Sequence, residues 1–465
     1  MVKRSSQPVL ISFFELFFFL LPTVLFSQTP AANSMENSFQ DAIAAEDRGD
    51  LAAAESLLRE LHSKHPGIFA IEESLGLLYV KQEKFEPALP LLKTAVREQP
   101  NSDAAHANLG AALYRLQRDK EALREFQAAA RLNPKNVKTQ QSLGRLLMEQ
   151  HHPVQAADAF ATALKLDPQN TDLILDRAQA LIQAGQPAQA VVELKAMPAV
   201  EQSASAQLLL GDAEEKLSSY QRAAEHYARA VELDPSEPNV WTLGVEFLRH
   251  WTFDPAIKEF EAAALKFPSS TRIKLGLGAA YFGGAKYADS IPVFADLLDA
   301  DPNNAVYAEL LGMSCTAVAE SNKDRCATLV QYAEAHPRDA RISTYAASML
   351  LTETSGEDRT NEARKLLVSA LSVDPRSPEA HYQMGLLKQN KGDWPGSVPS
   401  LEKAIALKPD LAAAHYRLAL AYWRTGRKQQ GQAEMELQKK YSKQGKADMD
   451  HRLRQITTFI VDVRN

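Results

Sequence analysis

The chain has little of what marks several large classes of protein. Its 465 residues include only two cysteines and contain no CxxCH, HExxH or GxSxG motif. These absences argue against a covalently attached haem, a zinc protease of the HExxH type and an α/β-hydrolase. The net charge is −6 and there is no basic stripe, so we expect no nucleic-acid partner. No group of residues has the spacing of a metal or cofactor site, and we expect neither.

Long runs of β-branched residues are scarce as well, whereas alanine is abundant. Alanine is the strongest helix former, so this balance favours α-helix over strand. Hydrophobic residues make up 45% of the chain and charged residues 24%, which is typical of ordered, soluble proteins. A chain of this length exceeds what one compact core accommodates, so it is expected to divide into domains or repeats.

Residues 1–27 have the composition of a secretory signal. Two basic residues precede an apolar run that holds a single charge, Glu15, and that ends before the small residue Ser27. This order of basic, apolar and small residues is typical of signal peptides. We expect cleavage between Ser27 and Gln28, then a linker over 28–34, and an exported protein that is periplasmic or extracellular. The alternative is an uncleaved anchor in the inner membrane, because the run is close to membrane-spanning length.

A phrase with a proline near its end recurs along the chain, as in "LNPKN" and "LDPQN". Apart from one double step, these prolines lie 33 to 38 residues apart: Pro66, Pro100, Pro134, Pro168, Pro235, Pro268, Pro302, Pro337, Pro375 and Pro409. In most units a Gly or Ala precedes the proline at a constant distance. A second small residue lies twelve positions after this Gly or Ala, and so still before the proline. Apolar residues three and four apart surround each small residue, which predicts two amphipathic helices per unit. The small residues allow close helix contact, and the proline stops the second helix.

This arrangement resembles the tetratricopeptide repeat, a unit of 34 residues with Leu-Gly in its first helix and an aromatic residue in its second. The Leu-Gly pair stands at Leu75–Gly76, Leu109–Gly110, Leu143–Gly144, Leu210–Gly211, Leu243–Gly244, Leu277–Gly278 and Leu311–Gly312. The aromatic residue stands at Phe126, Phe160, Tyr227, Phe260 and Phe294. The resemblance implies an all-α fold, an α-solenoid in which about twelve hairpins over 35–440 form a right-handed superhelix. It also implies a C-terminal capping helix over 441–465.

One stretch, "GLGAAYFGGAK" at 276–286, imitates a glycine-rich phosphate loop. Gly278 is nevertheless in phase with the Leu-Gly glycines of the neighbouring units, and no strand pattern precedes it. We interpret it as a helix-packing residue. His106, His381 and His415 take the same place in three first helices, where the family prefers an aromatic residue, and we interpret them as packing residues too.

The two cysteines fall in one predicted hairpin. Cys315 takes the eleventh position of its first helix, and Cys326 lies early in the second helix. In an exported protein these residues are candidates for a disulfide. The alternative is two buried thiols that never meet, because the geometry of the bridge is strict.

Ligands of the family that the chain resembles lie on the concave face that the first helices line. The resemblance therefore implies that a partner contacts aromatic, basic and amide side chains on these helices. The candidates are Tyr114, Arg115, Arg145, Tyr345, Tyr382, Gln383, Tyr416, Arg417, Trp423 and Arg424. A peptide with acidic and aromatic groups would suit the C-terminal members of this set. The alternative is that they are ordinary surface residues or contacts between repeats.

The regions outside the repeats are too short for a catalytic domain. We therefore expect a non-catalytic scaffold that binds a partner protein or peptide in the cell envelope or outside the cell. The alternative is an accessory or carrier subunit of an envelope enzyme or assembly complex, which would bind a glycan or a small ligand. The partner itself does not follow from the repeats, because proteins of one fold differ in the chemistry of their surfaces.

Overall fold

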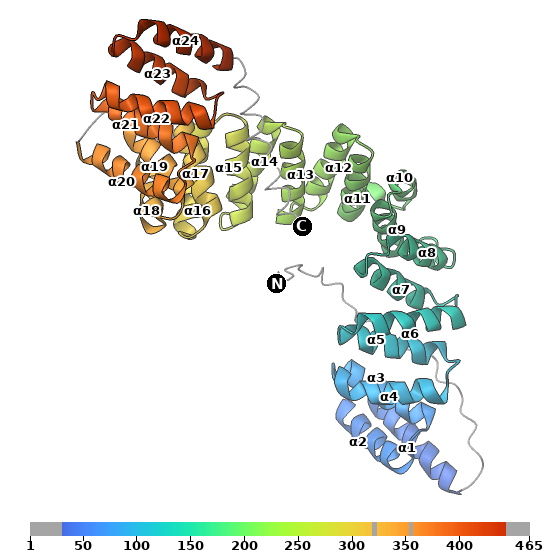
Figure 1. The fold of residues 1–465 in the computed structure, drawn as a ribbon. Helices are drawn as coiled ribbons and strands as arrows, with labels where there is room; N and C mark the ends of the chain where they lie inside the picture. Colours follow the sequence, from blue (N-terminus) through green and yellow to red (C-terminus); the bar gives the residue numbers. More distant parts are fainter. Residues whose placement is uncertain (1–29, 319–322, 353–356, 443–465) are drawn as a thin grey trace. The chain divides into compact units, whose positions relative to one another are not determined.

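The computed structural model describes residues 30–318, 323–352 and 357–442. Within these ranges it contains 24 α-helices, one short 3₁₀ helix and no strand (Figure 1). The predicted all-α class is confirmed. The predicted signal peptide and nearly all of the predicted capping segment, residues 441–465, lie outside the described residues.

The helices follow one another with short connections. They are α1 (Pro30–Asp47), α2 (Leu51–Lys64), α3 (Phe69–Lys81), α4 (Phe85–Glu98), α5 (Asp103–Arg115), α6 (Asp119–Leu132), α7 (Val137–Glu149), α8 (Pro153–Leu164), α9 (Thr171–Gln183), α10 (Pro187–Lys195), α11 (Ala204–Lys216), α12 (Tyr220–Leu233), α13 (Glu237–Arg249), α14 (Phe253–Lys266), α15 (Thr271–Gly283), α16 (Tyr287–Ala300), α17 (Ala305–Ala317), α18 (Lys323–Ala335), α19 (Ala340–Thr352), α20 (Glu357–Val373), α21 (Pro378–Asn390), α22 (Trp394–Leu407), α23 (Ala412–Arg424) and α24 (Lys428–Ser442). The 3₁₀ helix η1 (Val200–Gln202) follows α10.

Two predicted boundaries differ from the structure. α1 begins at Pro30, so residues 30–34 belong to a helix and not to the linker predicted over 28–34. Proline suits the first turn of a helix because its missing N–H would be unpaired there, and the two alanines that follow are strong helix formers. At the other end α24 extends to Ser442, so the first two residues of the segment 441–465 belong to the last hairpin.

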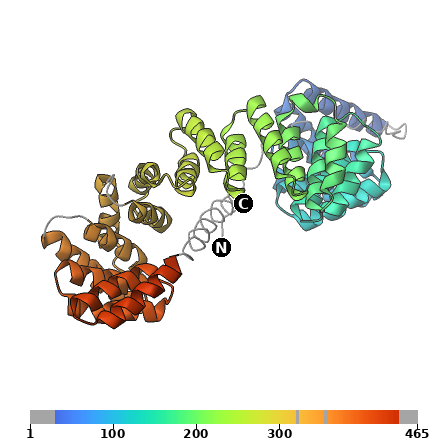
Figure 2. The same ribbon diagram turned by 90° about the horizontal axis from the view of Figure 1, so that it is seen from above.

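Consecutive helices pair into hairpins, and each hairpin packs on the next. The odd-numbered member is the first helix of its hairpin and the even-numbered member is the second helix. The chain divides into two compact units, residues 1–223 and 224–465, with the division inside α12. Within each unit the second helix of one hairpin lies against the first helix of the next, as α8 lies against α9 and α22 against α23 (Figures 1 and 2).

The recurring phrase ends one helix and begins another. In most units, the residue two positions after its proline is Ser or Asn, and this residue is the N-cap of the next first helix. Its side chain accepts a hydrogen bond from the backbone N–H three positions later, at Ser102, Asn136, Asn170, Ser270, Asn304 and Ser377. Such a bond pairs one of the free N–H groups at the start of a helix. The proline and the cap together therefore set the boundary between successive hairpins.

The turn inside most hairpins contains one residue with positive φ. Gln117 and His151 hold this place in two hairpins of the first unit, with φ of 57° and 60°, and Gly185 holds it in the next, with φ of 76°. Glycine adopts this left-handed conformation freely, whereas other residues do so at a cost in free energy. The chain thus meets one backbone requirement with different residues.

Glycines in the first helices make room for aromatic rings of the second helices. A Cβ added at Gly144 would lie 2.5 Å from the ring of Phe160, and one at Gly244 would lie 2.3 Å from the ring of Phe260. The same ring also meets Gly276 of the next hairpin, where an added Cβ would lie 2.5 Å from it. These contacts explain why glycine recurs inside helices although it lowers helix stability by about 1 kcal/mol relative to alanine.

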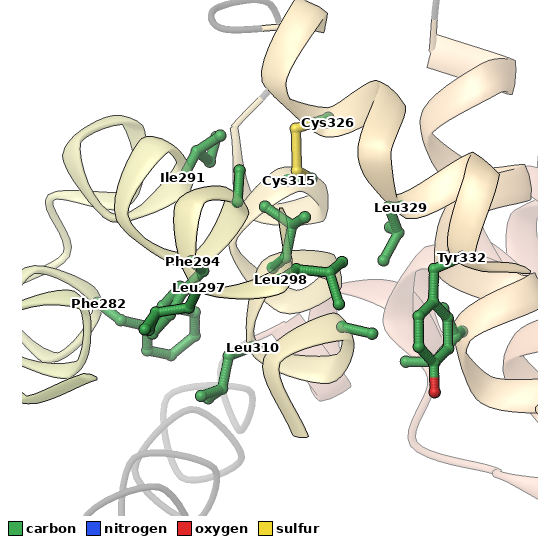
Figure 3. Close-up of a cluster of buried hydrophobic side chains, with 14 of the residues drawn as sticks. Phe282, Ile291, Phe294, Leu297, Leu298, Leu310, Cys315, Cys326, Leu329 and Tyr332 are labelled. Atoms are coloured by element: carbon green, nitrogen blue, oxygen red, sulfur yellow. A yellow bond between two sulfur atoms is a disulfide. The ribbon is translucent and has the colours of Figure 1, made fainter. Parts of the chain in front are cut away.

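Buried apolar residues form clusters that run through several consecutive hairpins. The largest cluster lies in the second unit and extends from Val240 to Leu387. Part of it appears in Figure 3, where Phe282, Phe294 and Leu310 lie beside one another. Among the described helices, none combines the length and the apolar character that crossing a membrane requires.

Candidate interaction surface

The first helices of successive hairpins lie close to one another. Contacts join α3 to α5, α7 to α9 and α9 to α11 in the first unit, and α13 to α15, α17 to α19, α19 to α21 and α21 to α23 in the second. Among the described second helices, only α16 and α18 make comparable contacts with each other. Each unit therefore curves locally with its first helices on the inner side of the bend. We call this side the first-helix face.

Polar bonds between neighbouring hairpins cross the first-helix face at a regular spacing. The bonded residues are 35 apart in five cases: Lys81 to Glu46 (3.5 Å), Asn108 to Glu73 (3.1 Å), Tyr114 to Glu149 (2.5 Å), Gln141 to Asp176 (3.1 Å) and Gln383 to Ser348 (2.9 Å). One period plus one residue separates each donor from its acceptor. These bonds, which we call rungs, join successive first helices from α1 to α9 in the first unit and join α19 to α21 in the second.

Two of the predicted contact residues in the first unit belong to this network. Tyr114 donates its hydroxyl to Glu149, and both burial and this carboxylate raise the pKa of the tyrosine. Arg145 pairs with Asp176 at 2.9 Å, and their side chains are 21% and 18% exposed. The structure therefore engages both residues in contacts between repeats.

Arginine also stacks on an aromatic residue of the preceding hairpin. The Arg115 guanidinium lies 4.7 Å from the ring centre of Phe85 and 3.6 Å from the carboxylate of Glu83. Arg424 repeats this arrangement over Trp394, at 5.3 Å. In both pairs the arginine ends a first helix and the aromatic residue begins the second helix 30 residues earlier. That spacing is visible in the sequence and would have revealed the pairing.

Glu73 is a buried carboxylate within a rung. It is 7% exposed, and its bonded partner Asn108 is 4% exposed. Burial raises the pKa of Glu73 to about 7, which the hydrogen bond from Asn108 only partly offsets. The residue was not among the predicted candidates, because nothing in its spacing distinguishes it from a surface glutamate.

Tyr345 packs inside the chain. A Cβ added at Gly312 in α17 would lie 2.6 Å from its ring, so the tyrosine fills the space beside that glycine. In other hairpins an aromatic residue sixteen positions after the glycine fills this space, but the corresponding residue here is Thr328. Tyr345, which comes from the next hairpin, takes over this role.

The remaining candidates lie on α21 and α23. Tyr382 is half-buried against the core, and Gln383 forms a rung. Tyr416 and Trp423 are 43% and 38% exposed. The structure thus separates candidates that the chain already engages from candidates that stay accessible.

Arg417 differs from the other candidate arginines. Its side chain is partly exposed and has no ion pair among the described residues. The preceding first helix offers Tyr382 and Leu386 nearby in the register, and neither supplies a carboxylate. In an earlier hairpin, the position that Arg417 holds here is occupied by Asp176. That aspartate accepts bonds from Gln141 and Arg145 of its preceding first helix. The corresponding positions of the preceding first helix therefore supply no carboxylate to pair with the positive charge of Arg417.

A disulfide joins Cys315 in α17 to Cys326 in α18, with the two Cα atoms 6.1 Å apart (Figure 3). Both cysteines are buried, at 7% and 3% exposure. The bridge connects the end of a first helix to the start of its second helix. It lies inside the hairpin and contributes no side chain to the first-helix face.

A surface hollow lies at the turn between α18 and α19, with a volume of about 710 Å³. Its lining mixes basic and acidic residues, among them Arg338, Arg341, Asp339 and Asp374. Arg341 is ion-paired with Glu309. Within the described part of the chain, no group of three or more His, Cys, Asp or Glu side chains is placed to hold a metal ion.

Family models match the chain at several places. Three models described as tetratricopeptide repeat match residues 74–137 and 242–305, 147–213, and 204–237, and one described as TPR repeat matches 390–426. Together they cover more than half of the chain. No curated protein matches it in sequence.

Solved structures with similar helical arrangements include three that cover different shares of the chain. A structure of Naa15/Naa10 bound to HypK-THB is 16% identical to this chain, with a TM-score of 0.39. The match covers 87% of this chain and 68% of the chain in that structure. YrrB, described as a TPR protein with an unusual peptide-binding site, is 18% identical over 39% of this chain and 94% of its own, with a TM-score of 0.36. PilF from Pseudomonas aeruginosa is 19% identical over 44% and 95%, with a TM-score of 0.36.

Proposed function

Because the chain belongs to the tetratricopeptide repeat family, we propose that it is a non-catalytic scaffold that binds a partner protein or peptide on its first-helix face. The observation that carries this proposal is the series of rungs between successive first helices. They hold first helices together before any partner arrives, from α1 to α9 in the first unit and at α19 and α21 in the second. A surface that is ordered in advance loses less entropy on binding than a flexible one.

The distribution of side chains supports the same face. Aromatic and arginine side chains are the residues that most often dominate binding energy at protein interfaces. On the first helices, Tyr416, Arg417 and Trp423 combine both types with partial exposure. Most large exposed apolar residues on the described second helices, such as Val192 and Leu265, are aliphatic, and Tyr220 is the aromatic exception; scattered residues of this kind are common on any protein surface.

We place this scaffold in the cell envelope or outside the cell. The signal-like composition of residues 1–27 is one support. The disulfide between Cys315 and Cys326 is a second support, because structural disulfides persist mainly in oxidising compartments.

The proposal is tested by affinity capture from the envelope fraction of cells that produce the full chain. A first-helix variant carries Tyr416→Ala, Arg417→Ala and Trp423→Ala. A matched control carries Val192→Ala, Leu265→Ala and Arg338→Ala, which remove two exposed apolar side chains and one arginine elsewhere. The expected result is a partner that the wild type and the control capture and the first-helix variant loses. A chain that captures no protein in any form would contradict the scaffold function.

A further inference from the structure

The aromatic edge of α23 is unusual for its place in the repeat. Three of its residues, Tyr416, Leu420 and Trp423, hold the positions three before, one after and four after the small residue Ala419. In α13 these positions are occupied by Trp241, Val245 and Leu248, which are 0%, 0% and 1% exposed. There the next hairpin contributes to the cover: α13 contacts α15, and Arg272 of α15 lies 4.6 Å from the ring centre of Trp241. In α23, by contrast, Tyr416 and Trp423 are more than a third exposed.

α24, the second helix of the hairpin that α23 begins, differs from the second helices on which a further hairpin packs. In α22, the residues Val398, Leu401 and Ile405 pack against α23. The residues 34 positions later, in α24, are Gln432, Met435 and Lys439. Two of the three are polar, so at these positions α24 offers a following first helix less apolar surface than α22 offers α23. The stack of hairpins is therefore expected to end at α24, while the edge of α23 stays apolar.

The charged residues of α23 itself have one sign. The only Lys, Arg, Asp or Glu residues in α23 are Arg417 and Arg424. Two nearby carboxylates are already bonded within the chain: Glu402 accepts the Tyr422 hydroxyl at 2.7 Å, and Glu434 lies 2.5 Å from His415. A partly exposed arginine without a carboxylate partner attracts acidic groups, and its planar guanidinium suits a carboxylate.

We propose that the edge formed by Tyr416, Arg417, Leu420, Trp423 and Arg424 is the docking site for an acidic partner segment that also carries apolar side chains. This inference rests on the proposed function and names the class of partner. Aromatic rings of the edge contact the apolar groups of the segment, and Arg417 pairs with a carboxylate. The chain's own residues 443–465 suit the edge less well, because they carry five Lys or Arg and only three Asp.

The test uses the full chain and a displayed library of random peptides. We expect the selected peptides to be enriched in Asp, Glu and large apolar residues. Binding of the synthetic peptides should weaken roughly tenfold or more in Arg417→Glu and in Trp423→Ala. Arg338→Glu is the matched control, since Arg338 is also an exposed arginine with no ion pair among the described residues, and it should leave binding unchanged. Peptides that are basic, or that bind Arg417→Glu as well as the wild type, would overturn the site.

A second measurement distinguishes other occupants of the edge. In a Trp251→Phe, Trp394→Phe background, the remaining tryptophans are the buried Trp241 and the exposed Trp423. Acrylamide should quench Trp423 readily in the free chain, and a selected peptide should suppress this quenching. A monomer whose Trp423 is already shielded would assign the edge to residues 443–465, and a shielded dimer would assign it to a second copy. Either result overturns the proposal. Affinity capture that the edge variants do not affect would overturn this site and leave the scaffold function standing.

Discussion

At the scale of single residues, the fold depends on how little space some positions leave. The ring of Phe260 meets both Gly244 and Gly276, which belong to the first helices of two successive hairpins. The ring is fully buried, so it has no solvent-filled space into which to move. Glycine at these positions is therefore a packing requirement and not a sign of backbone flexibility.

Gly244→Ala should destabilise the second unit although alanine is the better helix former. The added Cβ would lie 2.3 Å from the Phe260 ring, and the expected net loss is about 1–3 kcal/mol of unfolding free energy. Chemical denaturation measures it. The added variant Phe260→Leu provides space, so the loss in the double variant should be smaller than the sum of the single losses. Additive losses would contradict the contact.

The turn residues with positive φ allow a paired test. Gln117→Gly should stabilise the first unit by about 0.5–1 kcal/mol, because glycine relieves the cost of the left-handed conformation. Gly185→Gln places the reverse change in an equivalent turn and should destabilise the unit by a similar amount. Denaturant midpoints measured for both variants check the signs. If both variants changed stability in the same direction, the left-handed turn conformation would not be what decides the effect of these substitutions.

Glu73 should make the first unit lose stability as the pH rises. Its pKa in the folded chain is about 7, above the ordinary value of 4.5, so the folded state holds the proton more tightly than the unfolded state. The contribution to stability is fully present below about pH 4.5 and is lost as the pH rises through about 7, by up to roughly 3 kcal/mol. Glu73→Gln should abolish this loss, as measured by denaturation at pH 5 and pH 8. Glu86→Gln, at an exposed glutamate, is the control and should keep it.

At the scale of helices, two kinds of link hold neighbouring elements together. Apolar packing joins the helices of a hairpin, and rungs such as Tyr114 to Glu149 join first helices across hairpins. The hairpin of α17 and α18 has a covalent link as well, in the disulfide between Cys315 and Cys326.

Removal of this disulfide should lower the stability of the second unit. The two cysteines are 11 residues apart in sequence. Closure of a loop of this size restricts the unfolded chain by about 3 kcal/mol at most. A reducing agent should therefore lower the melting temperature of the wild type and leave a Cys315→Ala, Cys326→Ala variant unchanged. A drop of equal size in both proteins would mean that the reducing agent acts elsewhere.

At the scale of the whole molecule, the central expectation is an exported scaffold. Intact mass of the protein from a native host tests the leader directly. We expect a mass that lacks residues 1–27, with Gln28 as the first residue. Retention of the full mass in the membrane fraction would favour the uncleaved anchor instead, and retention in the cytosol would contradict export. A host whose signal peptidase is inhibited serves as the control and should accumulate the full-length mass.

Most of the fold could be predicted from the sequence, because the features that define the repeat are local in the sequence. The period of the prolines, the Leu-Gly pairs and the spacing of apolar residues depend on the chain's own helices and turns. They predicted the all-α class and the hairpins that the structure contains. The exceptions lie at the ends: the helix that begins at Pro30 replaces part of the predicted linker, because alanine favours helix where the proline already permits it.

The candidate surface could be predicted only in part. The sequence determined which side chains occur on the first helices, including Tyr114, Arg145 and Tyr416. Only the tertiary structure decided which of them are already engaged: Arg145 by Asp176 of the next hairpin, and Tyr345 by the space beside Gly312. The physical reason is that helical periodicity acts within one helix, whereas exposure and pairing depend on what the neighbouring hairpin brings against that helix. For Tyr416 and Arg417 the described neighbours bring little, and that is why they remain accessible at the end of the stack.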